Sequence, residues 1–397
     1  MYNKALSELS AGDVIMELNA QAAALAAEIG SENVFNYSIG NPNLPPPPSV
    51  YEAIASVLKE EDQTAVHGYG PNAGIREVRE AIAGHINSRF GQDLTYEDIF
   101  VVAGSCAGLS ILLKALAVPG DEVICIAPYF TEYAAFLMAA GAKLVAVDAD
   151  PQTFFPDVSA IREAISPRTR AVIVDSPNNP TGVIYPLEVL QDLAAMLREK
   201  ETEYGHPIYL VSDEPYREIV FEGEDLPYLM DLYDDTIVSY SYSKSLSLAG
   251  QRIGYLAFSS RIAERKEIIR AVAGAGRIYG HTCAPTLFQR VLLHCIGDTT
   301  DVSLYRQNRD LLVGQLEQCG FSFVPPHGAF YVMVKSPIPD AVAFARDAAQ
   351  RHHLFFVPTD AFGTKGYVRL SYCVSPEMIR RSFPALEQLA KDYGLLQ

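Results

Sequence analysis

Short apolar runs alternate with helical segments through the middle of the chain, which predicts strands connected by helices. The runs that predict strands are Ile99–Val102, Glu122–Ile126, Lys143–Val147, Ala171–Val174, Ile208–Val211, Thr236–Tyr240 and Ile253–Phe258. Most of the segments between them have the period of an α-helix, and a long one spans Pro186–Tyr204. Strands that alternate with helices indicate βαβ units and a mostly parallel sheet. Burial of such strands on both faces explains why the runs are largely apolar.

The two ends of the chain have a different pattern. An amphipathic stretch at Val14–Ile29 precedes four consecutive prolines at 45–48. Because proline donates no backbone hydrogen bond, we expect an extended connector at a domain edge, followed by a helix with Ser49 as its N-cap. After residue 285 the order is looser, with helices expected at 301–319, 340–352 and from 376, and strands at 321–324, 330–334, 354–357 and 367–371. We therefore predict a large domain over 49–284 and a smaller α+β domain made of 1–48 and 285–397.

Charge and cysteine usage narrow the class of protein. The 397 residues include 31 lysines and arginines against 48 aspartates and glutamates, a formal net charge of −17. Nucleic acids and anionic membranes select basic surfaces, so neither is an expected partner. No apolar run reaches the length of a membrane span, and no signal peptide is evident. The six cysteines contain no C-x-x-C pair, which predicts no metal site, no disulfide framework and a reducing cytoplasmic location.

A small-residue string at 104–108, Gly-Ser-Cys-Ala-Gly, lies between an expected strand and an expected helix. One interpretation is a nucleophile elbow, with Cys106 as an attacking thiolate. The other is a phosphate-binding turn, in which backbone N–H groups and the Ser105 hydroxyl contact a phosphate at a helix N-terminus. A tight turn with no ligand would also use glycines here. The string alone leaves these alternatives open.

Three further polar strings follow expected strands, at the edge of a parallel sheet where ligands bind. The string 174–182 carries two adjacent asparagines in a turn with two prolines. Asp213, just past the next strand, could be a metal ligand, a general base, a charge partner or a helix cap. No pair of histidines at i and i+4 accompanies it, which argues against the metal ligand. Lys244 stands among serines eight residues before Arg252, which suggests a cationic anion-binding pocket in an acidic protein. A lysine in such a pocket can also be a nucleophile, because nearby cations and burial lower its pKa.

Together these strings resemble the class I/II aminotransferases, pyridoxal-phosphate enzymes of fold type I. The resemblance extends from about Tyr37 to the final helix, with the markers in family order. They are SPNNPTG at 176–182, SDEPY at 212–216, SYSKSLSLAGQRIGY at 241–255 and GYVRLSY at 366–372. The resemblance implies a large domain with a mostly parallel seven-stranded sheet between helices, a smaller α+β domain, and pyridoxal 5′-phosphate as the cofactor.

The same resemblance assigns the catalytic roles. Lys244 is expected to form the Schiff base with the cofactor and then to move the proton between substrate Cα and the cofactor. Asp213 would pair with the pyridine nitrogen and keep it protonated, so that the ring accepts electrons. Tyr216 and Asn179 resemble the donors to the phenolic oxygen of the cofactor, which tune the Schiff-base pKa.

The remaining cofactor contacts follow by the same similarity. The expected phosphate ligands are Gly104, Ser105, Cys106, Ser241, Ser243 and Arg252. Arginine suits this role because its planar fork binds phosphate through two hydrogen bonds. Phe130, next to Tyr129, matches the aromatic residue that stacks on the cofactor ring. Tyr69 resembles the tyrosine that reaches the phosphate of a neighbouring subunit, which implies a homodimer with shared active sites.

For the substrate, Arg369 matches the arginine that binds the α-carboxylate, with Asn179 beside it and Gly40 closing over it. The expected reaction is transfer of an amino group from an L-amino acid to a 2-oxo acid, with 2-oxoglutarate as the expected acceptor. A carbon–sulfur β-lyase, which uses the same lysine and aspartate, is the alternative. A regulatory cofactor-binding module fused to a DNA-binding domain fits poorly with the acidic charge. Whether Arg277 binds a distal carboxylate or is a surface residue is left open.

Overall fold

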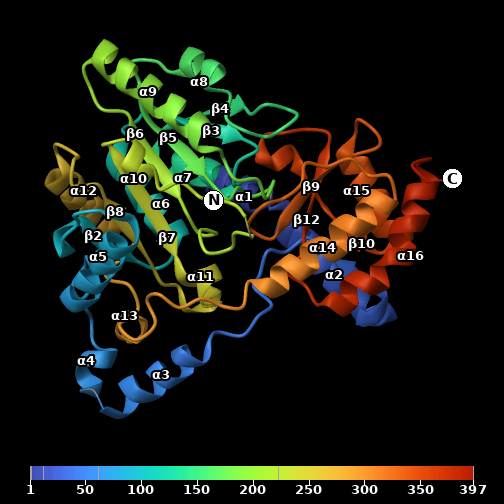
Figure 1. Cartoon of the computed structure of the whole chain (residues 1–397), viewed down its shortest axis with the longest axis horizontal. Coiled ribbons are helices and arrows are strands. Elements are labelled where there is room, and N and C mark those ends of the chain that lie inside the picture. Colours follow the sequence, from blue (N-terminus) through green and yellow to red (C-terminus); the bar gives the residue numbers. More distant parts are fainter. Residues whose placement is uncertain (1, 12, 61, 222, 397) are drawn as a thin grey trace.

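The computed structural model describes residues 2–11, 13–60, 62–221 and 223–396. Figure 1 shows a large sheet with helices on both faces beside a smaller sheet with its own helices. Helices α3 (Pro48–Glu60) and α4 (Gln63–His67) project from the large part at the bottom of this view. No helix in the described ranges combines the length and the apolar character that a membrane crossing needs.

The large sheet has seven strands, as predicted, in the order β2-β8-β7-β6-β5-β3-β4. Its strands are β2 (Ile99–Val102), β3 (Glu122–Ala127), β4 (Lys143–Asp148), β5 (Thr169–Asp175), β6 (Tyr209–Asp213), β7 (Thr236–Ser241) and β8 (Gly254–Phe258). Neighbouring strands run parallel except where β8 pairs antiparallel with β2 and β7. The expected mostly parallel sheet is therefore confirmed.

Both faces of this sheet are buried, which explains the apolar runs. In β3, Val123 and Cys125 pack with one group of buried residues, while Ile124 and Ile126 pack with another on the opposite face. The first face is covered by α6 (Ser105–Leu116), α7 (Glu132–Ala140) and α12 (Arg265–Ile278), and the second by α8 (Val158–Ala164), α9 (Leu187–Tyr204) and α10 (Leu229–Leu232). Successive residues of a strand point to opposite faces, so a doubly covered strand needs apolar residues at consecutive positions.

Three more helices complete the large part of the molecule: α5 (Arg76–Phe90), α11 (Tyr242–Ser245) and α13 (Thr286–Leu292). Helix α13 packs against α3, α4 and α5. The Thr286 hydroxyl donates to the Val66 carbonyl at 2.7 Å, and the Ile75 N–H donates to the Gln289 side chain at 2.7 Å. The division of the chain into domains at 48/49 and 284/285 stays a prediction, and α13 lies against the part that precedes it.

The smaller part is built on a three-stranded antiparallel sheet in the order β11-β12-β9. Its strands are β9 (Tyr331–Lys335), β11 (Val357–Pro358) and β12 (Tyr367–Ser371), and a separate parallel pair joins β1 (Phe35–Asn36) to β10 (Leu354–Phe355). The accompanying helices are α1 (Lys4–Ala11), α2 (Val14–Ile29), α14 (Ser303–Gln318), α15 (Ala341–His352) and α16 (Pro376–Asp392). Short 3-10 helices lie at Ser31–Asn33, Tyr96–Asp98, Ala249–Gln251 and Thr359–Phe362.

Four sequence predictions are corrected here. Residues 321–324 form no strand, because only Phe323 makes an isolated bridge, to Val334. The run 354–357 divides into β10 and β11, which pair with different partners. Helix α3 begins at Pro48, so Ser49 lies inside it and is not its N-cap; proline suits a first helical position because its missing N–H has no partner there. Helix α6 begins at Ser105, four residues before the predicted start.

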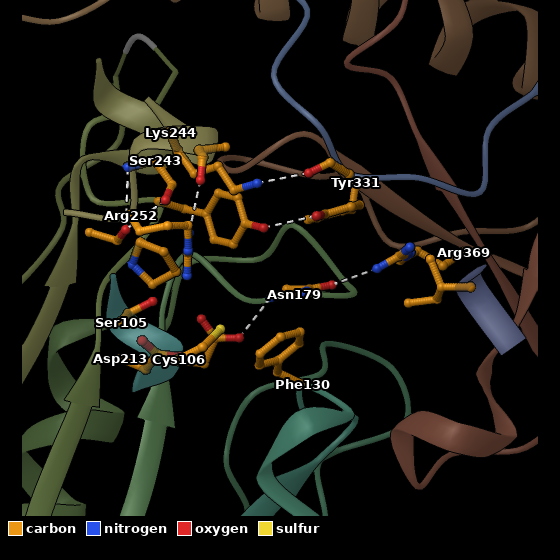
Figure 2. Close-up of a pocket in the computed structure, with 17 residues that line it drawn as sticks. Ser105, Cys106, Phe130, Asn179, Asp213, Ser243, Lys244, Arg252, Tyr331 and Arg369 are labelled. Atoms are coloured by element: carbon orange, nitrogen blue, oxygen red, sulfur yellow. Dashed lines mark hydrogen bonds between the residues drawn. The ribbon is translucent and has the colours of Figure 1, made fainter. Parts of the chain in front are cut away.

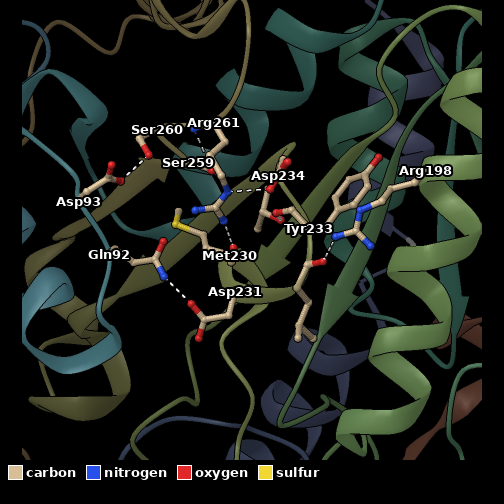
Figure 3. A network of polar contacts seen from close by, with 12 residues as sticks. Gln92, Asp93, Arg198, Met230, Asp231, Tyr233, Asp234, Ser259, Ser260 and Arg261 are labelled. Carbon is tan, nitrogen blue, oxygen red and sulfur yellow. Dashed lines mark hydrogen bonds and ion pairs between the residues drawn. The ribbon is translucent and has the colours of Figure 1, made fainter.

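Figure 3 shows a polar network at the end of the sheet where β7 begins. Arg261 donates to Asp234 at 2.7 Å and also to the Met230 carbonyl, and Ser260 donates to Asp93 at 2.5 Å. The ion pair is solvent-exposed, and exposed pairs add little stability. The network joins α10 to the turn after β8, at the end of β7 opposite the one that carries Ser241.

Candidate active site

A cavity of about 250 Å³ lies where β5, β6 and β7 end and α6 begins. Twelve of the predicted site residues line it: Gly40, Ser105, Cys106, Phe130, Asn179, Asp213, Tyr216, Ser241, Ser243, Lys244, Arg252 and Arg369. Ile15, Asp175, Pro215, Ala249 and Tyr331 complete the lining. The carboxyl ends of parallel strands meet at one edge of the sheet, which is why strings far apart in sequence converge here.

Lys244 reaches into the cavity from α11, the short helix directly after β7. Its Nζ donates to the carbonyl of Gly40 at 2.7 Å and lies 5.8 Å from the ring centroid of Tyr216 and 5.2 Å from that of Phe330 (Figure 2). Burial of the ammonium lowers the pKa of Lys244 to about 8, and the charges of Arg369 and Arg252 act in the same direction. A lysine with this pKa is partly neutral near pH 7, as a base or nucleophile must be.

Asp213 ends β6 on the floor of the cavity. The Tyr133 hydroxyl donates to its Oδ2 at 2.8 Å, whereas Oδ1 is buried with no hydrogen-bond partner in the described part of the chain. Burial raises the pKa of Asp213 to about 7, although the hydrogen bond from Tyr133 opposes the shift. Burial and the charge of Asp213 also raise the pKa of Asp175 at the end of β5. A buried carboxylate with a free oxygen calls for a cationic or donating partner.

The turn between β2 and α6 also borders the cavity. Gly104 has φ +82°, and a Cβ placed there would lie 2.6 Å from Nη2 of Arg252. Arg252 donates to the Ala249 carbonyl at 2.9 Å, and Ser241 donates to Ser243 at 2.8 Å. The start of α6, hydroxyl groups and a guanidinium therefore surround one space, the arrangement that binds phosphate.

Cys106 lies at this same helix start. Burial raises the pKa of the Cys106 thiol to about 11, so it is protonated near neutral pH. The cavity lining among the described residues contains no histidine to activate it. The nucleophile-elbow interpretation is therefore not supported, because the attacking species would be the thiolate.

Arg369 lies on β12 at the far side of the cavity and is only 2% exposed. It donates to the Asn179 side chain at 3.1 Å and to the Ser38 carbonyl at 2.6 Å, and its guanidinium lies 4.6 Å from the ring centroid of Tyr331. Its Nε is buried with no hydrogen-bond partner in the described ranges. A fixed cation with a free donor that borders the cavity is suited to an incoming carboxylate.

Three predicted or considered residues lie outside the cavity lining. Gly104, the residue before Ser105, is not in the lining, and its lack of a Cβ leaves room for Arg252. Tyr69 is 91% exposed on the surface. Arg277 is exposed near the end of α12, and it does not border the cavity within this chain.

Sequence reasoning missed Tyr133, Asp175, Tyr331 and Ile15. Asp175 precedes the asparagine turn. The backbone N–H of Asn179 donates to Oδ2 of Asp175 at 2.9 Å, so Asp175 helps to shape that turn. Its place at a strand end could have identified it. Tyr133 and Ile15 lie on helices with ordinary apolar patterns, and Tyr331 belongs to an apolar strand. Only contacts formed in the folded chain distinguish these three.

Comparison with known proteins gives a consistent result. The model of the family "Aminotransferase class I and II" matches residues 32–386. The chain is 36% identical over 366 residues to the aspartate/prephenate aminotransferase of Thermus thermophilus, covering 89% of this chain and 90% of that protein. It is 31% identical over 396 residues to the aspartate aminotransferase of Thermotoga maritima, covering 98% of each.

Solved structures agree with these matches. An aminotransferase from Eubacterium rectale superposes with a TM-score of 0.96 at 43% identity, covering 99% of both chains. The aspartate aminotransferase of Thermus thermophilus with maleate superposes with a TM-score of 0.84 at 32% identity, covering 95% of this chain and 96% of that one.

The fold is that of a fold type I pyridoxal-phosphate enzyme. The chain belongs to the class I and II aminotransferases, and it is an aminotransferase with pyridoxal phosphate as its cofactor. The carbon–sulfur lyase alternative is not favoured, because these relatives are named aminotransferases.

The residues present fit this cofactor. Oδ1 of Asp213, which has no partner in the described ranges, suits a protonated ring nitrogen. The guanidinium of Arg252 suits the phosphate, and it lies where a Cβ on residue 104 would contact it. Phe130 also borders the cavity and packs edge-on against Tyr133, with ring centroids 5.6 Å apart. A buried acid, a cation and an aromatic ring in one cavity match in chemistry the ring nitrogen, the phosphate and the ring face of pyridoxal phosphate.

Proposed function

We propose that this aminotransferase moves the amino group of an L-amino acid to a 2-oxo acid, with 2-oxoglutarate as the acceptor, in two half-reactions at one site. When bound, pyridoxal phosphate supplies an electron sink and holds the amino group between the half-reactions. The observation that carries the proposal is the convergence of Lys244, Asp213 and Arg369 on one cavity. Oδ1 of Asp213 and Nε of Arg369 have no hydrogen-bond partner in the described ranges.

In this proposal Lys244 binds the cofactor covalently and later moves the proton at the substrate Cα. Its pKa of about 8 supports this role, because the amine can give up and regain a proton near neutral pH. Without the cofactor, the hydrogen bond to the Gly40 carbonyl holds Nζ at the cavity. Gly40 therefore contributes through its backbone.

Asp213 is proposed to hold a proton on the ring nitrogen through Oδ1, while Tyr133 fixes Oδ2. The pKa of about 7 describes the carboxyl before a cation is present, and a cationic partner would lower it. Tyr216 and Asn179 are proposed to donate to the phenolic oxygen of the cofactor. Both border the cavity between Asp213 and Arg369, which supports the assignment.

Two arginines are proposed to bind two different anions, the cofactor phosphate and the substrate carboxylate. Arg252, with Ser105, Ser241, Ser243 and the backbone N–H groups of residues 105 and 106, would hold the phosphate, because the Gly104 N–H already donates to the Val102 carbonyl. Arg369 would hold the α-carboxylate of the substrate beside Asn179. Phe130 would cover the ring face.

We further propose a homodimer with shared active sites. Tyr69 is 91% exposed in this chain, which leaves its side chain available to a neighbouring subunit, as the proposal requires. Mixing inactive Lys244→Ala with Tyr69→Phe subunits tests the sharing, since hybrid dimers would contain one site with both native residues. A monomer at micromolar concentration by light scattering would contradict the proposed homodimer.

We also propose a cytoplasmic location. The six free cysteines support it, because disulfides are rare in a reducing compartment.

An amino-donor screen with 2-oxoglutarate tests the reaction. Glutamate must form in equal amount to the oxo acid derived from the donor. Release of ammonia and pyruvate without an acceptor would instead show β-elimination. Replacing 2-oxoglutarate with pyruvate or oxaloacetate identifies the acceptor.

A further inference from the structure

The hydroxyl of Tyr331 lies where three parts of the active site meet. It forms a buried hydrogen bond of 2.8 Å with the hydroxyl of Tyr216. The Tyr331 ring lies under the guanidinium of Arg369, with 4.6 Å between the guanidinium carbon and the ring centroid. Figure 2 shows Tyr331 pointing toward the cavity next to the contact between Lys244 and Gly40.

The third contact is with the backbone at Gly40. A Cβ on residue 40 would lie 1.9 Å from the Tyr331 hydroxyl oxygen, so the tyrosine occupies the space of a side chain there. The carbonyl of the same glycine accepts the hydrogen bond from Lys244 at 2.7 Å. Tyr331 thus supports the backbone that orients the lysine.

The hydrogen bond to Tyr216 also has a direction that matters. Burial raises the pKa of Tyr331 to about 12 and raises that of Tyr216, so both phenols are protonated near neutral pH. The other titratable groups that act on Tyr331 are Arg369, Cys373 and Asp175. Each phenol has one proton, so Tyr216 can donate to a cofactor only if Tyr331 donates the hydrogen bond between them.

We propose that Tyr331 is a positioning residue, whose hydroxyl orients the Tyr216 proton toward the cofactor and whose ring supports Arg369. The inference rests on the proposed function, because it assumes that Tyr216 donates to the phenolic oxygen. The hydroxyl and the ring have separate tasks, so separate substitutions distinguish them.

The test uses holoenzyme and two measurements: the pH midpoint of the visible absorbance of the bound cofactor, and the Kd of propionate as an unreactive carboxylate. Tyr331→Phe removes only the hydroxyl. Loss of one hydrogen bond in a donor chain should raise the midpoint by roughly half a pH unit, about threefold in the equilibrium. The propionate Kd should stay within about twofold, because the ring still contacts Arg369.

Tyr331→Leu also removes the ring and should weaken propionate binding by about threefold or more. Tyr37→Phe is the matched control: Tyr37 is a fully buried tyrosine of the same core, bonded through its hydroxyl to Ser382 at 2.6 Å, and it does not border the cavity. It should change neither measurement. Tyr331→3-fluorotyrosine keeps the hydroxyl and makes it a stronger donor, so the midpoint should fall, which provides a second test of the hydroxyl.

The outcomes separate this inference from the proposed function. If Tyr216→Phe raises the midpoint while Tyr331→Phe and the fluorinated variant leave it at the wild-type value, the positioning role is wrong and the proposed function stands. If Tyr216→Phe also has no effect, the proposed contact of Tyr216 with the cofactor fails. Equal midpoint shifts in Tyr331→Phe and Tyr37→Phe would show a general effect of removing a buried hydroxyl and would overturn the inference.

Discussion

Replacing Arg369 by leucine tests the assignment of the two arginines most directly. The substitution removes the buried cation, its free Nε and both of its hydrogen bonds, to Asn179 and to the Ser38 carbonyl. The substrate carboxylate would then have no charged partner on β12. Arg252 is untouched by the change, so the phosphate contact should persist.

The size of the effect follows from the hydrogen bonds that the guanidinium would donate to the substrate. A hydrogen bond to a charged group contributes about 1.5–3 kcal/mol. Removing one such bond from the bound carboxylate would weaken binding about tenfold or more, and removing both bonds of a two-point interaction would weaken it about 100-fold or more. The two protein acceptors left without a donor should also destabilise the fold by about 1–3 kcal/mol each.

The assay measures the Kd of propionate and the Kd of pyridoxal phosphate for each variant, with thermal unfolding as the check on folding. Arg369→Leu should raise the propionate Kd and the KM of every amino and oxo acid, while the cofactor Kd stays within about threefold. Arg369→Lys keeps the charge without the planar fork and should fall between wild type and leucine. Arg252→Leu should weaken the cofactor about tenfold or more and leave propionate binding nearly unchanged. Exchanged phenotypes for the two leucine variants would refute the assignment.

Four further predictions follow from the same cavity. Borohydride reduction of the holoenzyme should place the label on Lys244, and peptide mapping that finds it on another lysine would contradict the site. Asp213→Asn should lower kcat by several orders of magnitude. Because the folded pKa of Asp213, about 7, is above that of an unfolded aspartate, the cofactor-free wild type loses stability as pH rises from about 4 to about 7. The unfolding free energy of the cofactor-free wild type should therefore fall, relative to that of Asp213→Asn, by up to about 1.4 kcal/mol per pH unit. If the difference between the two unfolding free energies stays constant over this pH range, Asp213 does not titrate within it. Gly104→Ala should weaken cofactor binding about tenfold, through strain at φ +82° and contact with Arg252, whereas Gly84→Ala, in open space on α5, should leave it unchanged.

Much of the large sheet could be predicted, because all of its strands except the edge strand β4 are buried on both faces and so form largely apolar runs. The predicted boundaries of β2, β3, β4 and β7 lie within one residue of those observed. The smaller sheet was harder to predict. The run at 321–324 forms no strand and contributes only an isolated bridge. The run at 354–357 contributes residues to two different sheets, through β10 and β11. Apolar character marks a segment as buried and does not specify its partner strand.

The site could be predicted where its chemistry lies in short strings after strands. Lys244, Asp213 and Asn179 each belong to a local turn, and the edge of a parallel sheet brings such turns together. Resemblance to the family then gave Arg369 its expected partner. The prediction that Ser49 is an N-cap was wrong, because the helix begins at Pro48. Serine favours the N-cap and proline favours the first helical position, and in this segment the two preferences predict different helix starts.

By itself, the sequence determined the alternating architecture, the acidic character and the identity of the groups that can carry out chemistry, since these depend on residue type and near neighbours. Only the tertiary structure decided which groups are left unpartnered and which support them. Gly40 accepts a hydrogen bond from Lys244, which is 204 residues away in sequence. Tyr331 forms its hydrogen bond with Tyr216, which is 115 residues away. No local pattern encodes such pairs, because they form when the two sheets pack around one cavity and water is excluded from the groups between them.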